Sequence, residues 1–323
     1  KHCEYDRKIL SCTISLLKNI FLTKMNWLKI KAYFIVALGV FIWSSGLPII
    51  DHLLHKWDFL SLATARSIIG GIFLIIISII ISRKIPKKKI LKDAGYIGLT
   101  TYGFSSICTI IGISYSDPIT ASILVTLIPV VSAVIDIFIS KWMISWKLIL
   151  AILFSISGGI LASLDLNQLK FVFGLGELFV LTSAFLFVLY SRSIARYLTY
   201  ASQISVLSIS TLSGGIGMLM VTIFTRFLGN ELSYSFEPEY LIPLLFLGII
   251  SMGFSVQFWF YGVKRLGVTQ ASLLQNLAPV FVMLIMLVLG KSFEVMKVIG
   301  GALVILAAVI TQIEKKTKNS SKI

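Results

Sequence analysis

The chain has 323 residues, of which 57% are hydrophobic and only 13% are charged, and its formal net charge is +15. Soluble globular domains carry about a quarter of their residues as charged ones, so this composition excludes that class, and the high apolarity excludes a disordered chain. The three cysteines allow no disulfide framework, and the three histidines lie outside the apolar runs, which leaves no histidine chemistry at membrane depth.

The chain begins with a leading segment, residues 1–31, to which we assign no function. Its apolar stretch 9–22 is interrupted by Ser11, Thr13, Lys18 and Asn19. A signal peptide requires a continuous apolar core and a small-residue cleavage site, and this segment has neither. We expect residues 1–24 to be a non-native or over-extended leader, with an interfacial amphipathic helix as the alternative, and residues 1–31 as a whole to lie outside the repeats.

Ten apolar runs follow, and each approaches the roughly 20 residues that a membrane-spanning helix needs. They lie at 32–50, 59–81, 94–115, 119–139, 146–164, 173–191, 203–225, 240–261, 269–289 and 297–313. The third and fourth are separated by Ser116-Asp117-Pro118, and the proline is typical of a helix start. The sequence therefore predicts an all-α integral membrane protein with ten transmembrane helices.

Lysine and arginine orient these spans. With the N-terminus inside, the inner segments hold nineteen of them: Lys24, Lys29, Lys31, Arg83, Lys84, Lys87, Lys88, Lys89, Lys92, Lys141, Lys147, Arg192, Arg196, Lys264, Arg265, Lys315, Lys316, Lys318 and Lys322. The outer segments hold five: Lys56, Lys170, Arg226, Lys291 and Lys297. Because positive residues accumulate on the cytoplasmic side, we expect both termini in the cytoplasm of a cell with a bacterial inner membrane. The net charge then reflects membrane topology, and we expect no nucleic-acid partner.

The chain also matches itself. At an offset of 150 residues, 97–160 aligns with 247–310, and the matches include Gly103-Phe104-Ser105 with Gly253-Phe254-Ser255 and Pro129-Val130 with Pro279-Val280. At an offset of 144, Gly70-Gly71-Ile72 matches Gly214-Gly215-Ile216. We place the first repeat at 32–164, the second at 173–313 and a cytoplasmic tail at 314–323. Five spans is an odd number, so the second repeat enters the membrane from the opposite side, as in many secondary transporters.

Several motifs carry a resemblance to a known family. Trp43-Ser44-Ser45 lies in the first span, Arg66 in the second, and the segment 258–280, FWFYGVKRLGVTQASLLQNLAPV, has the first-half counterpart 116–130, SDPITASILVTLIPV. Over roughly 32–313 the chain resembles the EamA-type ten-helix members of the drug/metabolite transporter superfamily. The resemblance implies a secondary carrier for small organic metabolites, often an exporter.

Prolines indicate where a site could form. Pro129 and Pro279 are equivalent under the repeat and lie near the middle of their spans. Each removes a backbone N–H donor and so frees the carbonyl four residues earlier, a state tolerated in the bilayer where the backbone faces protein or a water-filled cavity. We expect a substrate site at this depth, with an inert kink as the alternative. Its candidate residues in these spans are Thr126, Pro129, Gln275, Asn276 and Pro279.

Helical spacing predicts that one face of the third span also lines the substrate site. Thr101, Ser105 and Thr109 lie on one face of the third span, and small hydroxyl residues in membrane helices either line a cavity or hold helices together. Aromatic and amide side chains nearby favour a cavity. The candidate residues of this wall are Trp43, Tyr102, Thr109, Tyr190, Gln257 and Trp259.

Ionisable residues inside the membrane are costly and suggest function. Arg66 has three interpretations: its side chain extends to the interface, pairs with Glu177, or attracts a substrate carboxylate. Asp136 and Glu177 are candidates for proton coupling. His52 and His55 lie in an outer loop, where we expect solvated side chains and no metal site.

These features favour a transporter that works by alternating access and carries amino-acid-like solutes without a cofactor. Export is a direction that the resemblance alone implies, and the residues do not decide it. The expected partners are a small-molecule substrate and the lipid bilayer, and a homodimer is compatible with the pattern. The alternative within the class is an uptake carrier for a nucleotide- or cofactor-type metabolite. A channel or an intramembrane enzyme is disfavoured, because the chain shows neither pore-lining polar rings nor a paired nucleophile and base at membrane depth.

Overall fold

The computed structural model describes residues 2–82, 87–140, 174–229, 231–291, 295–303 and 305–306, and between them residues 146, 149–150, 153–154, 157–158, 161, 164–165 and 170–171. About half of the residues in each of the predicted spans 146–164 and 297–313 lie outside the described residues, and the tail 314–323 lies wholly outside them. The count of ten spans can accordingly be compared with the structure for eight of them.

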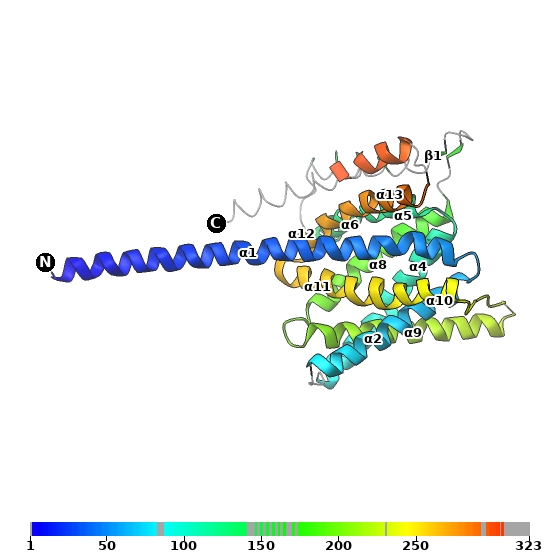
Figure 1. Cartoon of the computed structure of the whole chain (residues 1–323), viewed down its shortest axis with the longest axis horizontal. Helices are drawn as coiled ribbons and strands as arrows, with labels where there is room; N and C mark the ends of the chain where they lie inside the picture. The colour runs from blue at the N-terminus through cyan, green and yellow to red at the C-terminus, as the bar shows by residue number, and fades with distance from the viewer. Residues whose placement is uncertain are drawn as a thin grey trace.

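Six helical segments of the described chain are long and apolar enough to cross a membrane: Trp27–Leu53, Phe59–Ile81, Lys88–Ser114, Leu175–Ala195, Gln203–Phe227 and Pro238–Leu266. The first belongs to α1 (His2–Leu53), whose N-terminal part extends well beyond the bundle (Figure 1). The second and fifth correspond to α2 (Phe59–Ser82) and α9 (Gln203–Phe227), and the fourth to α8 (Leu175–Ala195). The prediction of an all-α membrane protein is confirmed.

The third and eighth spans have the same interruption. The third runs through α3 (Lys88–Ile97), the π-helical turn η1 (Gly98–Tyr102) and α4 (Gly103–Ser114). The eighth runs through α10 (Pro238–Leu245), the π-helix η2 (Phe246–Phe254) and α11 (Ser255–Leu266). π-helical turns are rare and concentrate at functional sites, so their presence at equivalent places in both repeats directs attention to this depth.

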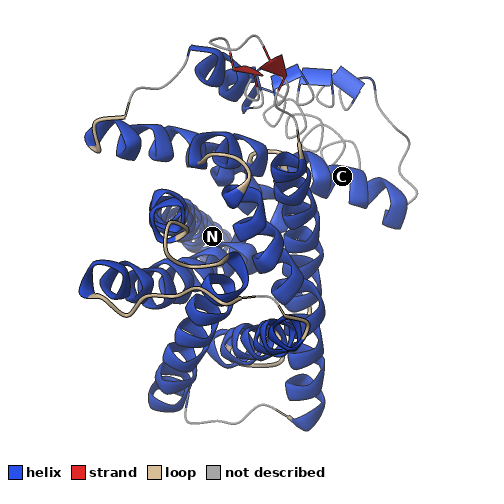
Figure 2. Cartoon of the chain, turned by 90° about the vertical axis from the view of Figure 1, so that its right-hand side faces the viewer, coloured by secondary structure: helices blue, strands red, loops and turns tan. Residues whose placement is uncertain are grey.

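The fourth and ninth spans are also broken at equivalent points. The fourth consists of α5 (Pro118–Val125) and α6 (Ile128–Ser140), and the ninth of α12 (Val268–Ser272), the 3₁₀ turn η3 (Leu273–Leu277) and α13 (Ala278–Val288). A two-residue antiparallel pair, β1 (Leu164–Asp165) with β2 (Lys170–Phe171), lies at the edge of the bundle (Figure 2).

Carboxylates mark three helix starts at one end of the bundle. Asp117 accepts hydrogen bonds from the backbone N–H groups of Ile119 and Thr120 at 2.9 and 3.1 Å, which satisfies the first turn of α5 and confirms the predicted start at Pro118. Asp58 does the same for α2, and Glu177 accepts from the N–H of Gly174 at the start of α8. The ends of these spans are therefore set by local hydrogen bonding as well as by apolar length.

The helices α2 and α9 cross in close contact, and they run antiparallel. Near one end Thr64 is hydrogen-bonded to Thr222, and near the other Ser78 is hydrogen-bonded to Ser205, each at 2.9 Å between side-chain oxygens. Between these pairs the backbones approach so closely that only glycine fits. A Cβ atom at Gly71 would lie 2.7 Å from the Cα of Leu212.

This crossing maps onto itself under the repeat. A Cβ atom at Gly215 would lie 3.1 Å from the backbone nitrogen of Ile68, and residues 68 and 71 become 212 and 215 when 144 is added. A second pair of contacts is also related by the repeat. Gly98 packs on the carbonyl of Ser210, and its equivalent Gly248 packs on the carbonyl of Arg66, the equivalent of Ser210. The two halves are thus related by a pseudo-two-fold axis that passes through the crossing, as an inverted repeat requires.

The crossing makes a prediction about stability. Gly98→Ala places a methyl group against the Ser210 carbonyl, and such overpacking costs about 1–3 kcal/mol. We expect a lower melting temperature for purified Gly98→Ala in detergent, measured by the loss of monodisperse protein on heating. The matched control is Gly95→Ala one turn away, where the nearest atom is the Ile209 Cγ2 at 4.0 Å. Equal melting temperatures for the two variants would contradict the proposed contact.

Candidate functional site

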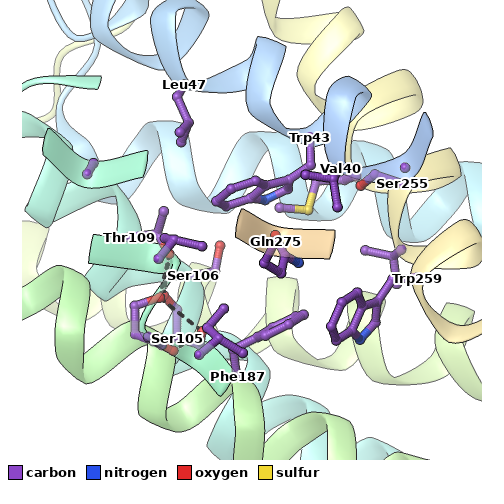
Figure 3. A pocket seen from close by; sticks show the side chains of 18 of the residues that line it. Val40, Trp43, Leu47, Ser105, Ser106, Thr109, Phe187, Ser255, Trp259 and Gln275 are labelled. Atoms are coloured by element: carbon purple, nitrogen blue, oxygen red, sulfur yellow. Dashed lines mark hydrogen bonds between the residues drawn. The ribbon is translucent and has the colours of Figure 1, made fainter. Parts of the chain in front are cut away.

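A cavity lies between the two repeats, with about 920 Å³ of space free of atoms including its open side. Its walls come from α1, α2, η1, α4, α5, α6, α8, η2, α11 and η3, so both halves of the chain contribute. Figure 3 shows labelled side chains from α1, α4, α8, α11 and η3 around one common space. Its wall is mostly apolar with a few polar groups, which is the character of a small-molecule site.

The lining residues occur mainly as pairs related by the repeat. At an offset of 144 the pairs are Val36 with Val180, Gly39 with Ser183, Val40 with Ala184 and Trp43 with Phe187. At an offset of 150 they are Tyr102 with Met252, Ser105 with Ser255, Ser106 with Val256, Thr109 with Trp259 and Val125 with Gln275. The cavity therefore straddles the pseudo-two-fold axis, and one of these pairs meets across it, with the Tyr102 hydroxyl 3.2 Å from the Met252 sulfur.

Half of the predicted substrate-binding residues line this cavity. They are Trp43, Arg66, Tyr102, Thr109, Trp259 and Gln275. Four of them, Trp43, Thr109, Gln275 and Trp259, can be followed in Figure 3. The structure thus brings together residues from the first, second, third, eighth and ninth spans, which are far apart in the sequence.

The other predicted residues lie outside the lining that the described chain forms. Thr126 and Asn276 are buried beside the lining residues Val125 and Gln275. Pro129 and Pro279 lie in the first turns of α6 and α13. Gln257 faces α9, where the Gln203 amide donates to its backbone carbonyl at 2.8 Å and to its side-chain oxygen at 3.1 Å.

Tyr190 lies one layer behind the wall. Its ring packs 5.4 Å from the ring of Tyr102, and its hydroxyl is 2.9 Å from the hydroxyl of Ser210. The place opposite Trp43 is taken instead by Phe187, one helical turn earlier, which packs 5.5 Å from the ring of Trp259. The offset of 144, which pairs residue 43 with residue 187, is the signal that identifies Phe187 in the sequence.

At the helix breaks in the fourth and ninth spans, backbone groups form hydrogen bonds to residues three positions away, as in a 3₁₀ turn. The carbonyl of Gln275 accepts a hydrogen bond from the N–H of Ala278, and Thr126 N–H donates to the carbonyl of Ile123 at 3.1 Å. The prediction that Pro279 frees the Gln275 carbonyl is therefore wrong, because a 3₁₀ turn re-forms the bond three residues away. The unpaired acceptors at this break are side-chain atoms, the buried Oε1 of Gln275 and Oδ1 of Asn276.

The hydroxyl stripe mainly joins two helices. The Ser105 hydroxyl donates to the carbonyl of Ser183 at 3.0 Å, and the Ser183 hydroxyl donates back to the carbonyl of Ser105 at 2.9 Å. Thr109 adds a contact of 2.6 Å to the Ser183 hydroxyl, whereas Thr101 donates to Ile97 within its own helix. These bonds hold α4 against α8 and satisfy most of the polar capacity of the stripe.

Arg66 is buried, with 3% of its surface exposed, and it lines the cavity. Its Nη2 donates to the Ser106 hydroxyl at 2.9 Å, while its Nε has no hydrogen-bond partner. Glu177 is engaged elsewhere, since it accepts from the Ser116 hydroxyl at 2.9 Å and from the Gly174 N–H. Of the three interpretations of Arg66, extension to the interface and pairing with Glu177 do not match this geometry.

The remaining residues considered from the sequence are Asp136 and the two histidines His52 and His55. The side chain of Asp136, in α6, lies outside the described residues. His52 stacks on Tyr240 with ring centroids 5.4 Å apart, and His55 Nδ1 lies 3.0 Å from the carbonyl of Asp51. Within the described residues, no group of three or more His, Cys, Asp and Glu side chains is placed to hold a metal ion.

Comparison with known proteins gives consistent results. A family model described as the EamA-like transporter family matches residues 30–164 and 174–313. Among curated proteins of Bacillus subtilis (strain 168), the uncharacterized transporter YyaM is 26% identical over 242 residues, which cover 72% of this chain and 77% of that protein. The uncharacterized transporter YdfC is 22% identical over 284 residues, covering 88% and 91%. A solved crystal structure with 18% identity has a similar fold, with a TM-score of 0.65 over 89% of this chain and 98% of that one.

The cavity predicts a pattern of chemical accessibility. In a chain whose three natural cysteines are replaced, Val125→Cys places a thiol in the cavity wall, whereas Ile123→Cys on the same helix places one in a fully buried position outside it. We expect a small water-soluble thiol reagent to modify Val125→Cys at least about tenfold faster, because only that thiol meets solvent. Equal rates, measured by mass spectrometry, would contradict the cavity.

Proposed function

This chain belongs to the EamA-like transporter family, and from that membership we propose that it carries small organic solutes, amino acids and related carboxylates among them, by alternating access. The observation that supports the proposal best is the cavity whose walls come in repeat-related pairs. In a protein built from inverted repeats, exchanging the conformations of the two halves converts an inward-open state into an outward-open one around a fixed site.

The chemistry of the wall supports a solute of amino-acid size. Trp43, Phe187 and Trp259 offer apolar and aromatic surface, while Arg66 and Gln275 offer one cationic donor group and one amide. Ligand sites combine predominantly apolar walls with a few placed polar groups that orient the ligand. An apolar body with a carboxylate matches this set of residues.

We further propose export across a bacterial inner membrane, with both termini in the cytoplasm. The described turns fit that orientation, because Arg192 and Arg196 lie at one end of the bundle while the Asp58, Asp117 and Glu177 helix caps lie at the other. Proton coupling is assigned in the same proposal to Asp136 and Glu177. Because Glu177 serves as a helix cap, its protonation would also loosen the start of α8.

The orientation predicts the result of labelling. Tyr200 and Tyr234 are exposed residues in turns at opposite ends of the bundle. In a cysteine-free background we expect an impermeant thiol reagent added outside intact cells to label Tyr234→Cys, and to label Tyr200→Cys only after the membrane is opened. Labelling of both from the same side would contradict the proposed topology.

Transport itself is tested with purified protein in vesicles. We expect uptake or efflux of at least one labelled amino acid or organic acid, measured with and without a proton gradient. Gln275→Ala should reduce that flux by about tenfold, since a lost hydrogen bond to a ligand in a desolvated site costs about 1–2 kcal/mol.

The matched control for that experiment is Gln203→Ala, which removes an amide outside the cavity wall. Its flux should stay close to that of the unmodified protein. Unchanged flux for every solute in Gln275→Ala, with the protein correctly reconstituted, would show that the site is elsewhere.

A further inference from the structure

The cavity wall contains one positive charge that no described residue neutralises. Arg66 is the one charged residue among the side chains that line it, and its surface is 97% removed from solvent, being 3% exposed. Among the described residues the guanidinium forms no ion pair, and one of its nitrogens, Nε, has no hydrogen-bond partner at all. Its one hydrogen-bond acceptor there is the neutral hydroxyl of Ser106.

A buried cation without a counter-charge is unfavourable. Removing it from water is energetically costly, and that cost is recovered only where an anion and further hydrogen bonds surround it. Inside membrane proteins such residues pair with one another or mark the path of a charged substrate. Since the described chain supplies no anion here, the missing counter-charge is one that a ligand can bring. The planar guanidinium is suited to a carboxylate, which can accept two parallel N–H bonds.

The side-chain amide of Gln275 is a second polar group in the cavity wall with an unpaired atom. Gln275 is 7% exposed, lines the same cavity, and presents a buried Oε1 with no hydrogen-bond partner. It comes from the second repeat, whereas Arg66 comes from the first. A neutral amide oxygen accepts a hydrogen bond from a hydroxyl or N–H group but cannot neutralise an ammonium ion.

We infer that the cavity selects organic monoanions, carboxylates with a neutral hydrogen-bond donor and an apolar body, over amino acids of the same skeleton. This inference rests on the proposed transport function and narrows its substrate class. With a monoanion bound, the site is electrically neutral. With a zwitterion bound, the added ammonium leaves the site with the same net charge of one that it has when empty, and that ammonium meets no carboxylate in the described wall.

The experiment compares ligands that differ at one group. Binding of 3-phenyllactate, phenylalanine, phenethylamine and the methyl ester of 3-phenyllactate to the purified full chain is measured by competition and by thermal stabilisation. We expect 3-phenyllactate to bind at least about tenfold more tightly than each of the other three, a difference of about 1.4 kcal/mol. Phenylalanine or the ester binding as tightly, or no binding of 3-phenyllactate at millimolar concentration, overturns the inference.

Variants of Arg66 test whether this arginine causes the preference for the carboxylate. Arg66→Gln should remove the preference for 3-phenyllactate over its ester, while Arg66→Lys, which keeps the charge, should retain part of it. A preference that survives Arg66→Gln would overturn the assignment. Should Arg66→Gln fail to fold, the comparison of acid with ester in the unmodified chain still decides whether the cavity prefers a carboxylate.

The flux assay separates this inference from the proposed function. If 3-phenyllactate binds selectively but no panel solute crosses vesicle membranes, the transport proposal fails and the selectivity stands. If solutes are carried and amino acids are preferred, the selectivity fails and the transport proposal stands.

Discussion

The close crossing of α2 and α9 is the contact on which the rest of the structure depends. Gly71 and Gly215 allow the two backbones to touch, and these two glycine contacts are counterparts of each other under the repeat. The crossing therefore fixes the pseudo-two-fold axis, and the axis fixes where the remaining spans meet. The cavity lies on that axis because its wall is assembled from the same pairs of positions in each half.

Polar groups in the protein interior are of two kinds. Those with all their hydrogen bonds formed hold the helices together, and those with an unpaired atom facing the cavity are candidates to bind a ligand. The hydroxyls of Ser105 and Ser183 satisfy each other's backbones, and Tyr190 with Ser210 forms a similar pair behind the wall. Arg66 and Gln275 are as deeply buried, yet each retains an unpaired atom. Buried polar groups are normally paired. Among the described residues with an unpaired buried atom, Arg66 and Gln275 are the two that line the cavity, and this is the physical basis of the site assignment.

The sequence alone predicted the positions of the described spans, the start of α5 and the inverted repeat, because apolar length, proline and matching glycines are local signals. Helix rotation is not such a signal. A shift of one residue turns a side chain by about 100°, and the π-helical turns η1 and η2 add such shifts without altering the apolar pattern. Gln257, which follows η2, was accordingly placed in the wall by sequence reasoning. In the regular helix α8, Tyr190 was placed there and Phe187 was missed, because Trp43 was matched one helical turn too late in the second repeat.

Asp117 introduces a difference between the two faces of the protein. Its carboxylate starts α5 and also lies 3.0 Å from the ammonium of Lys297, which belongs to the other repeat. The equivalent residue on the opposite face is Gly267, which turns the chain with φ +81° and has no side chain to offer a partner. Two perfectly equivalent halves would make the opposite-facing states equal in energy. Among the described residues this ion pair has no equivalent on the opposite face, because Gly267 has no side chain, so in the proposed transport cycle the two opposite-facing states would differ in energy.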